Sequence, residues 1–446
     1  MTSIRRLFLL GVAAGLIAGA CSSSVATPAT TPAPTPAPTP AGSEPAATST
    51  TTVPTLDLKF GVLVGLTGDA ASSGQAWNQS VVTAVDYVKQ TVQSMSLADK
   101  IKVSMVGSED SQGSATSGVE AAKKLVDVDK ANIVVGDLYS SVTIAAFQSV
   151  FLPDKILEFT GGTNPDITTM VKNNLLWRPV SSDALQGQVL AQVMADAFSK
   201  TATVNVVTRN DAYGTGLQQV FEQSWTKNGG KIGKTVVFDP QASTLDTEAQ
   251  IAVQGNPDAW VFITFCGDFA KLKGPLVRSG HWDPLKSFGS DTLQSCTGNE
   301  TIVPGMRGTQ ATFSNGSSFP DYEKLFKSTA PSNVEFQGFA SEAFDSVFLG
   351  FLAALQARSS DPAVIGQHVQ DISGPPGTNY PTYSFLQLKD AINAVLSGQK
   401  IHFTGAGGPI SFDANGDITA NSYIIYQAQQ DGSTPPIKTI VFPSGS

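Results

Sequence analysis

Three short segments concentrate small polar side chains directly after apolar runs, and they are the part of the chain best suited to hold a solute. The segments are residues 66–74 (LTGDAASSG), 136–141 (GDLYSS) and 160–165 (TGGTNP). Each leads into a stretch with helical spacing, where hydroxyl groups and free N–H groups could bind a carboxylate or another anion. The same residue types also serve as helix caps. Three such loops on one sheet edge favour a pocket.

Residue types that carry catalysis or bind metals are sparse. Only three histidines occur, His281, His368 and His402, and their spacing fits no metal-ligand pattern. The sequence contains neither a Gly-x-Ser-x-Gly nucleophile elbow nor a His-Glu-x-x-His motif. We therefore expect a binding protein that is not an enzyme and uses no metal or other cofactor. A hydrolase is the alternative from the enzyme classes.

Composition also limits the partners of the chain. Of its 446 residues, 41% are hydrophobic and 15% are charged, as is typical of a packed globular protein. The formal net charge is -9, and lysine and arginine form no cluster. Nucleic acid and an anionic membrane surface both select for clustered basic side chains, so neither is expected as the main partner.

The first 20 residues have the pattern of a signal peptide. Arg5 and Arg6 precede an uncharged apolar stretch at 7–20, which is too short to span a bilayer comfortably. The paired arginines also resemble a twin-arginine export signal, so export by the general or the twin-arginine route stays open.

The apolar stretch ends at a cysteine that could carry lipid. Residues 16–21 (LIAGAC) resemble the bacterial lipobox, in which Cys21 would be lipidated and become the mature N-terminus. Ala18 stands where the strongest form of this motif has leucine. The alternative is an ordinary cleaved signal with an incidental cysteine. We expect a lipid anchor at the outer face of the cell membrane.

Residues 21–55 read as a tether between this anchor and the fold. They are almost wholly Ser, Thr, Pro and Ala. So few apolar side chains cannot offset the entropy of ordering, and repeated proline favours extended polyproline II segments. Beyond the tether, Cys266 and Cys296 are the remaining cysteines. In an oxidising compartment we expect a disulfide between them, with two free buried cysteines as the alternative.

From residue 56 the chain alternates apolar strands with amphipathic helices, in two series. The expected strands are residues 60–64, 101–106, 133–135 and 156–159, then 203–207, 235–238, 259–263 and 285–289. The expected helices are residues 77–88, 119–126, 144–150, 189–198, 217–225 and 343–357. This alternation predicts an α/β fold of two Rossmann-like lobes with parallel-sheet cores, joined by a hinge. Ligand sites in such sheets lie at the carboxyl ends of the strands.

Between about residues 57 and 428 the chain resembles the type 1 periplasmic binding proteins, specifically the branched-chain amino-acid (Leu/Ile/Val) binding family of ABC importers. The segments that carry the resemblance are residues 66–74, 136–143, 160–163, 210–214 (NDAYG) and 408–417 (GPISFDANGD). The resemblance implies a first lobe of residues 56–180 and 309–408 and a second lobe of residues 181–308 and 409–446. It further implies a monomer that delivers a small solute, an amino acid or related carboxylate, to a membrane permease by hinge closure. A lobe that senses solute for a separate membrane signalling partner uses the same fold.

The resemblance also assigns roles to individual residues. Ser140, which follows Tyr139 in the second loop, and Thr163 would hold a ligand carboxylate with N–H groups of Gly161 or Gly162. Tyr213 would close over the ligand from the second lobe.

Three further positions concern selectivity. Asp291 falls where the family pairs an acidic residue with an α-ammonium, and its alternative role is a helix cap. Ser73 and Cys266 occupy positions where relatives often have aromatic rings. Both departures leave the identity of the solute open.

Overall fold

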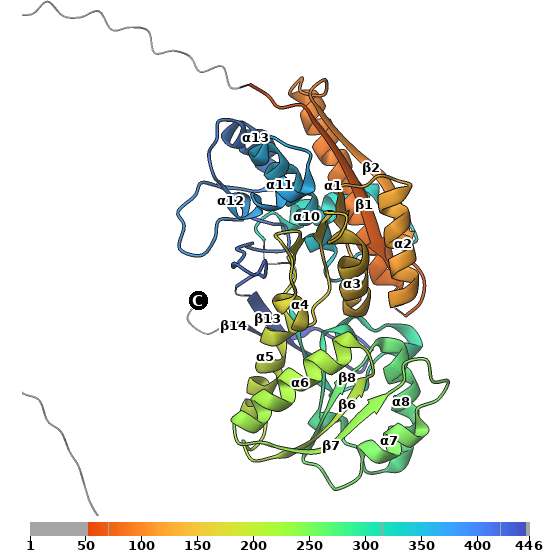
Figure 1. The fold of residues 1–446 in the computed structure, drawn as a ribbon. Coiled ribbons are helices and arrows are strands. Elements are labelled where there is room, and N and C mark those ends of the chain that lie inside the picture. Colours follow the sequence, from red (N-terminus) through yellow and green to blue (C-terminus); the bar gives the residue numbers. More distant parts are fainter. Residues whose placement is uncertain (1–51, 70, 313, 315, 420, 443–446) are drawn as a thin grey trace, which may run out of the picture. The chain divides into compact units, whose positions relative to one another are not determined.

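Strand β1 (Leu56–Val64) begins the first of two main sheets, and its side chains show why a parallel sheet forms. Leu58, Phe60 and Val62 share a buried core with helices α1 (Ala71–Ser94) and α10 (Ala340–Ala357). Leu63 points to the opposite face, where it packs with α2 (Ala115–Asp127). Helices therefore cover both faces, as the apolar sequence of the strand predicts (Figure 1). This computed structural model describes residues 52–442 except 70, 313, 315 and 420. The signal peptide, Cys21 and the tether up to residue 51 lie outside the described residues.

The first sheet has five parallel strands. In order across the sheet they are β2 (Ile101–Asp110), β1, β3 (Ile133–Val135), β4 (Leu157–Phe159) and β5 (Leu176–Trp177). The remaining helices of this lobe are α3 (Ser140–Ala146), α4 (Asp166–Thr169), α9 (Phe319–Thr329), α11 (Pro362–Gly366), α12 (Val369–Ser373) and α13 (Leu388–Leu396), with a π-helical turn at Phe147–Phe151. Two short parallel strands, β11 (Thr382–Tyr383) and β12 (His402–Phe403), form a separate small sheet.

The second sheet has seven strands and is mixed. Its order is β14 (Pro436–Phe442), β13 (Asn421–Gln427), β10 (Arg307–Ala311), β9 (Ser287–Gly289), β8 (Ala259–Ile263), β6 (Thr203–Arg209) and β7 (Lys231–Phe238). Strands β6 to β10 run parallel, whereas β13 pairs antiparallel with both β10 and β14. The antiparallel edge extends the expected parallel-sheet core by two strands. The short connection between β13 and β14 permits only a hairpin.

Helices cover both faces of the second sheet as well. Val261 and Ile263 of β8 pack in one core with α5 (Asp183–Ala197) and α6 (Ala212–Lys227), and the intervening Phe262 packs with α7 (Asp246–Ala252) and α8 (Cys266–Ser279). Figure 1 shows α6 and α8 flanking the strands of this lobe. Short 3-10 turns at Pro284–Lys286, Asp291–Ser295, Gly298–Glu300 and Phe385–Gln387 complete the elements.

The lobe boundaries differ from the expected ones at two places. Residues 309–311 were expected in the first lobe, but they lie in β10 and pair with β13 of the second sheet. The stretch that starts at residue 409 was expected in the second lobe. Its apolar residues Ile410, Phe412 and Ile418 instead belong to the first lobe's core, where Phe412 packs on Trp177 with ring centroids 5.2 Å apart. The chain rejoins the second sheet only at β13.

Candidate functional site

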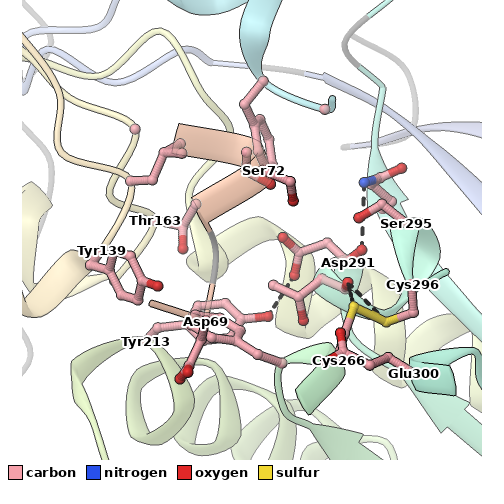
Figure 2. A pocket seen from close by; sticks show the side chains of 18 of the residues that line it. Asp69, Ser72, Tyr139, Thr163, Tyr213, Cys266, Asp291, Ser295, Cys296 and Glu300 are labelled. Atoms are coloured by element: carbon pink, nitrogen blue, oxygen red, sulfur yellow. Dashed lines mark hydrogen bonds between the residues drawn. A yellow bond between two sulfur atoms is a disulfide. The ribbon is translucent and has the colours of Figure 1, made fainter. Parts of the chain in front are cut away.

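A cavity of about 160 Å³ is lined by loops of both lobes (Figure 2). A water molecule needs about 10–15 Å³ of such space, so the cavity could hold about ten waters or a solute of similar size. Residues of the first lobe contribute Asp69, Ser72, Ser73, Leu138, Tyr139, Gly161, Thr163, Gly338 and Phe339. Residues of the second lobe contribute Tyr213, Phe265, Cys266, Asp291, Thr292, Ser295, Cys296, Thr297, Glu300 and Gln310. The carboxyl ends of the strands supply most of these loops, as expected for α/β sheets.

Asp291 is the buried charged group of this cavity. It follows β9, and its Oδ1 accepts hydrogen bonds from the Tyr213 hydroxyl at 2.6 Å and the Gln186 amide at 2.9 Å. Burial raises the pKa of the Asp291 carboxyl, and these two hydrogen bonds oppose the rise. Tyr213 and Gln186 thus hold the carboxyl group in one orientation. A cationic group in the cavity would be a natural partner for it, because a buried carboxylate without a counter-charge is costly.

The 160–164 loop meets the start of α5 through a buried hydrogen bond. The Thr163 hydroxyl donates to Asp183 Oδ2 at 2.8 Å, and the Asp183 N–H donates back to the Thr163 carbonyl at 2.9 Å. Burial, and after it the charge of Asp291, raise the pKa of Asp183 well above its usual value. Two acidic side chains therefore lie close together, Asp291 in the lining of the cavity and Asp183 behind Thr163.

Ser140 supports the same loop from α3. Its Oγ accepts the backbone N–H groups of Thr163 and Asn164, each at 3.1 Å, and the side chain is buried. The Gly161 N–H donates to the Asp137 carbonyl at 3.0 Å, and the Gly162 N–H donates to the Thr160 hydroxyl at 3.0 Å. The loop is thereby fixed from inside the first lobe.

Aromatic rings form one wall. Phe265 stacks with Tyr213 and meets Tyr139 edge-on, with centroid separations of 5.6 Å in both cases. The Arg209 guanidinium lies over Phe265, 3.6 Å from the ring centroid. Since Tyr139 comes from the first lobe and Phe265 from the second, this wall joins the two lobes.

Arg209 is itself surrounded by acidic side chains. It forms ion pairs with Asp211 and Asp268 of its own lobe and with Asp69 of the first lobe, the last at 3.7 Å. Asn164 of the first lobe also donates its side-chain amide to the Ala212 carbonyl of the second. The structure therefore shows the lobes in contact around the cavity.

A disulfide joins Cys266, at the start of α8, to Cys296, and both residues line the cavity. The disulfide holds residues 292–296 next to the start of α8. Beside it, Thr292 donates its hydroxyl to the Thr264 carbonyl at 2.6 Å. The wall that carries Asp291 is thus fixed at both ends.

The described residues show no group of three or more His, Cys, Asp or Glu side chains suited to a metal ion. Among the described residues that line the cavity, the ionisable side chains are carboxyl groups and tyrosines, with no histidine, lysine or arginine. The geometry offers binding contacts.

The family model described as "Periplasmic binding protein" matches residues 57–433. The chain belongs to this family. Its fold is the type 1 periplasmic binding protein fold, with parallel-strand sheets in two lobes, and family members are solute-binding proteins of the ABC transporter type. Over the described residues, no helix combines the length and the apolar character needed to cross a membrane.

Three known proteins are similar to the chain in sequence or in fold. The chain is 24% identical over 311 residues to the chemotactic signal transduction system substrate-binding protein BasB of Halobacterium salinarum, covering 67% of this chain and 70% of BasB. It is similar in fold to the substrate-binding protein LivJ of Streptococcus pneumoniae in complex with isoleucine, with TM-score 0.65, 18% identity and coverage of 86% and 99% of the two chains. A solute-binding protein of R. palustris in complex with 4-hydroxybenzoate gives TM-score 0.67, 14% identity and coverage of 86% and 97%.

The residues expected at the ligand site fall into two groups. Ser73, Tyr139, Gly161, Thr163, Tyr213, Cys266 and Asp291 line the cavity. Ser140 and Gly162 do not, because Ser140 is turned toward the 163–164 backbone and Gly162 packs against Thr143 and Ile167. Contact of Ser140 and Gly162 with a ligand stays a prediction; in this structure Ser140 holds the 160–164 loop through its bonds to the Thr163 and Asn164 N–H groups.

Other contributors were missed by the sequence reading. They are Phe265, Phe339, Gln186, Gln310, Asp183 and Glu300. A signal existed for Phe265, which directly precedes Cys266 after an apolar strand. None existed for Asp183, whose sequence context of Ser182-Asp183 reads only as a helix start.

Proposed function

We propose that the chain is an exported lipoprotein that captures a small solute, an amino acid or a related compound, and delivers it to the permease of an ABC importer. The observation that carries this proposal is the cavity between the lobes, to which Thr163 contributes from one side and Tyr213 and Asp291 from the other. A site divided in this way forms completely only when the lobes meet. Family membership supports the same assignment.

Hinge closure is the mechanism that this division favours. Contacts made only in the closed state shift the population toward it, and solute that bridges the lobes adds to those contacts. The Asp69–Arg209 ion pair and the Tyr139–Phe265 ring contact are of this kind. We infer that the protein acts as a monomer that opens to load and release its solute.

The proposed anchor is Cys21, which lies outside the described residues. Its support is the apolar stretch and the LIAGAC segment before it. Replacement of Cys21 with serine should move the protein from the membrane fraction to the soluble fraction and remove the acyl mass from the mature chain, with solute affinity unchanged. An unaltered distribution between the fractions would count against the anchor.

Sensing is the second candidate function, because the relative BasB is named as part of a chemotactic signal transduction system. The two functions differ in the membrane partner. Crosslinking of the solute-loaded chain in membranes should recover an importer permease. Recovery of a signalling receptor instead would favour sensing.

Solute binding itself is tested by thermal unfolding of the purified chain with amino acids, amines and aromatic acids. A ligand at 100 times its dissociation constant should stabilise the fold by about 2.7 kcal/mol. Asp291→Ala should abolish the shift, whereas Asp246→Ala, at an exposed position on α7, should leave it unchanged. Turnover of the stabilising compound would contradict a binding protein.

A further inference from the structure

One continuous segment of the second lobe, residues 295–300, forms a polar edge of the cavity, here named the distal edge. The members of this segment that line the cavity are Ser295, Cys296, Thr297 and Glu300. Figure 2 shows Ser295 and Glu300 at the end of the cavity away from Tyr139. Apart from the half-cystine Cys296, every side chain of the distal edge is polar or is the hydrogen atom of a glycine.

The backbone of the distal edge is held at two points by α8. The Cys266–Cys296 disulfide joins its second residue to the first residue of the helix. Lys273 Nζ donates to the carbonyls of Asn299 and Thr301 at 3.0 and 2.9 Å. Because less ordering is needed when a solute binds to a fixed segment, the side chains of this edge are suited to discriminate between solutes.

Gln310 adds a buried acceptor close to the distal edge. It lines the cavity from β10 and is 3% exposed, and its Nε2 donates to the carbonyl of Asp291, the first residue of the turn that leads into the edge. This contact is long, at 3.5 Å, and the Oε1 atom has no hydrogen-bond partner among the described residues. A buried acceptor without a partner costs free energy, which a donor on the solute would recover.

Glu300 gives the distal edge a negative charge. Its side chain is exposed at the cavity and forms no ion pair with another residue that the structure describes. Its Oε1 lies near the N-terminal end of α8, since a Cβ built on Gly267 would be 3.7 Å from it. The carboxylate therefore offsets the partial positive charge of this helix end. With no lysine, arginine or histidine among the described lining residues, the edge favours N–H donors over a second carboxylate on the solute.

The hydroxyl groups of Ser295 and Thr297 complete the pattern, because a hydroxyl donates as well as accepts. A carboxamide carries two N–H donors and one oxygen acceptor, so it could use Glu300 or Gln310 through its nitrogen and a hydroxyl through its oxygen. An aliphatic group at the same place would displace water from these side chains and form no hydrogen bond in return.

We propose that the distal edge and Gln310 recognise a group with N–H donors, in the simplest case a carboxamide, at the end of the solute farthest from its α-carbon. Cys266 and Cys296 act as positioning residues for this edge. The solute class is thus amino acids with a polar, uncharged end, such as asparagine or glutamine, rather than branched aliphatic ones. This inference rests on the proposed solute-binding function and deepens it.

Two series of matched size test the proposal by calorimetric titration of the purified chain. One series is asparagine, leucine and aspartate, and the other is glutamine, 2-amino-5-methylhexanoate and glutamate. Within a series the α-amino and α-carboxyl groups are constant, while the far end is an amide, a pair of methyl groups or a carboxylate. In at least one series the amide should bind about tenfold more tightly than the aliphatic compound and about 100-fold more tightly than the acid.

Glu300→Gln tests the charge of the distal edge at an exposed position, where the fold tolerates the change. It should weaken the amide and strengthen the acid, so that the ratio of their affinities falls by about tenfold. Glu120→Gln, exposed on α2, is the matched control and should leave this ratio unchanged. Gln310→Met removes the buried acceptor at similar volume and should lower the ratio of amide to aliphatic affinity.

The double variant Cys266→Ser/Cys296→Ser, titrated below its unfolding transition, tests the positioning role of the disulfide. A loosened edge must be ordered again when the amide binds, so the ratio of amide to aliphatic affinity should fall. A disulfide that only stabilises the fold would leave this ratio as it is in the wild type, and that result would overturn the positioning role.

The outcomes separate the inference from the proposed function. Aliphatic compounds or acids that bind as tightly as the amides in both series, or a Glu300→Gln variant with the wild-type ratio of amide to acid affinity, overturn the inference and leave solute binding in place. Binding by none of the six compounds overturns the inference as well. The proposed function fails with it only if the wider thermal screen of amino acids, amines and aromatic acids is also negative.

Discussion

Arg178 and Asp417 form a buried ion pair across 239 residues of chain, with the Arg178 Nε 2.9 Å from Asp417 Oδ1. The same guanidinium donates to the carbonyls of Thr163 and Asn164 at 3.1 and 2.8 Å. Asp417 is the last residue of the 408–417 segment. Arg178 therefore links this segment to the 160–164 loop, which lines the cavity.

Arg178→Met should therefore destabilise the protein by about 3–5 kcal/mol, because it leaves Asp417 buried without its counter-charge. Urea unfolding measures the change. The matched control is Arg278→Met, since Arg278 and Asp246 form a pair whose side chains are 68% and 52% exposed. It should cost less than about 1 kcal/mol. Equal losses in the two variants would contradict a stabilising role of the buried Arg178–Asp417 pair.

Gly216 of α6 tests the proposed closure. A Cβ at this position would run into the Asn164 side-chain amide of the first lobe, so alanine opposes the contact between the lobes. Gly216→Ala should weaken solute binding by about tenfold, which is about 1.4 kcal/mol, while helix propensity keeps the stability of the fold near or above wild type.

The control for this variant is Gly274→Ala in α8. There the new Cβ would meet only the flexible end of Arg278, at 3.1 Å. Affinity measured by calorimetry should not change. If Gly216→Ala binds solute as tightly as Gly274→Ala does, closure does not depend on this contact.

Glu342 and Asp345 make stability depend on pH. Burial, followed by the charge of Asp345, raises the pKa of Glu342 to about 8, and burial raises the pKa of Asp345 to about 7. The folded state therefore binds more protons than the unfolded state between about pH 4.5 and 8, and the free energy of unfolding falls as the pH rises through this window.

Glu342→Gln should flatten this fall, by up to about 1.4 kcal/mol per pH unit. Melting curves from pH 5 to 8 measure it, with the exposed Glu120→Gln as control. A slope that stays the same in Glu342→Gln would show that Glu342 is ionised in the fold across this range.

The Cys266–Cys296 disulfide closes a loop with a sequence separation of 30. Loss of a cross-link of this size costs about 3–4 kcal/mol in the chain-entropy model. The double variant Cys266→Ser/Cys296→Ser should unfold at correspondingly lower urea concentration. A reducing agent should destabilise the wild-type chain and leave the double variant unaffected. Insensitivity of the wild type to reduction would contradict a structural disulfide.

Much of the fold could be predicted because apolar periodicity reports burial. The run at Ile133–Val135 is buried on both faces, and the helix expected at 343–357 is buried along most of its length. Strand β13 (NSYIIYQ) was missed although its isoleucines and tyrosines favour a strand. Its antiparallel pairing could not be predicted, because the partner β10 is distant in sequence and has the polar sequence RGTQA.

The position of the site could be predicted, but the hydrogen bonds that its residues make could not. The ends of the strands indicated where Thr163, Tyr213 and Asp291 would meet. The Thr163 hydroxyl donates to Asp183 because the chain enters the second lobe beside the 160–164 loop. The sequence does not show this proximity. Hydrogen bonds between distant segments decide which donors remain free for a ligand, and sequence spacing does not contain them.

The most direct measurement is dialysis of the purified chain against a mixed pool of small metabolites, followed by denaturation and mass spectrometry of what it retained. We predict close to one solute molecule per chain, recovered chemically unchanged, with much less retained by Asp291→Asn. Retention of nothing by the wild-type chain, or recovery of a converted product, would contradict it.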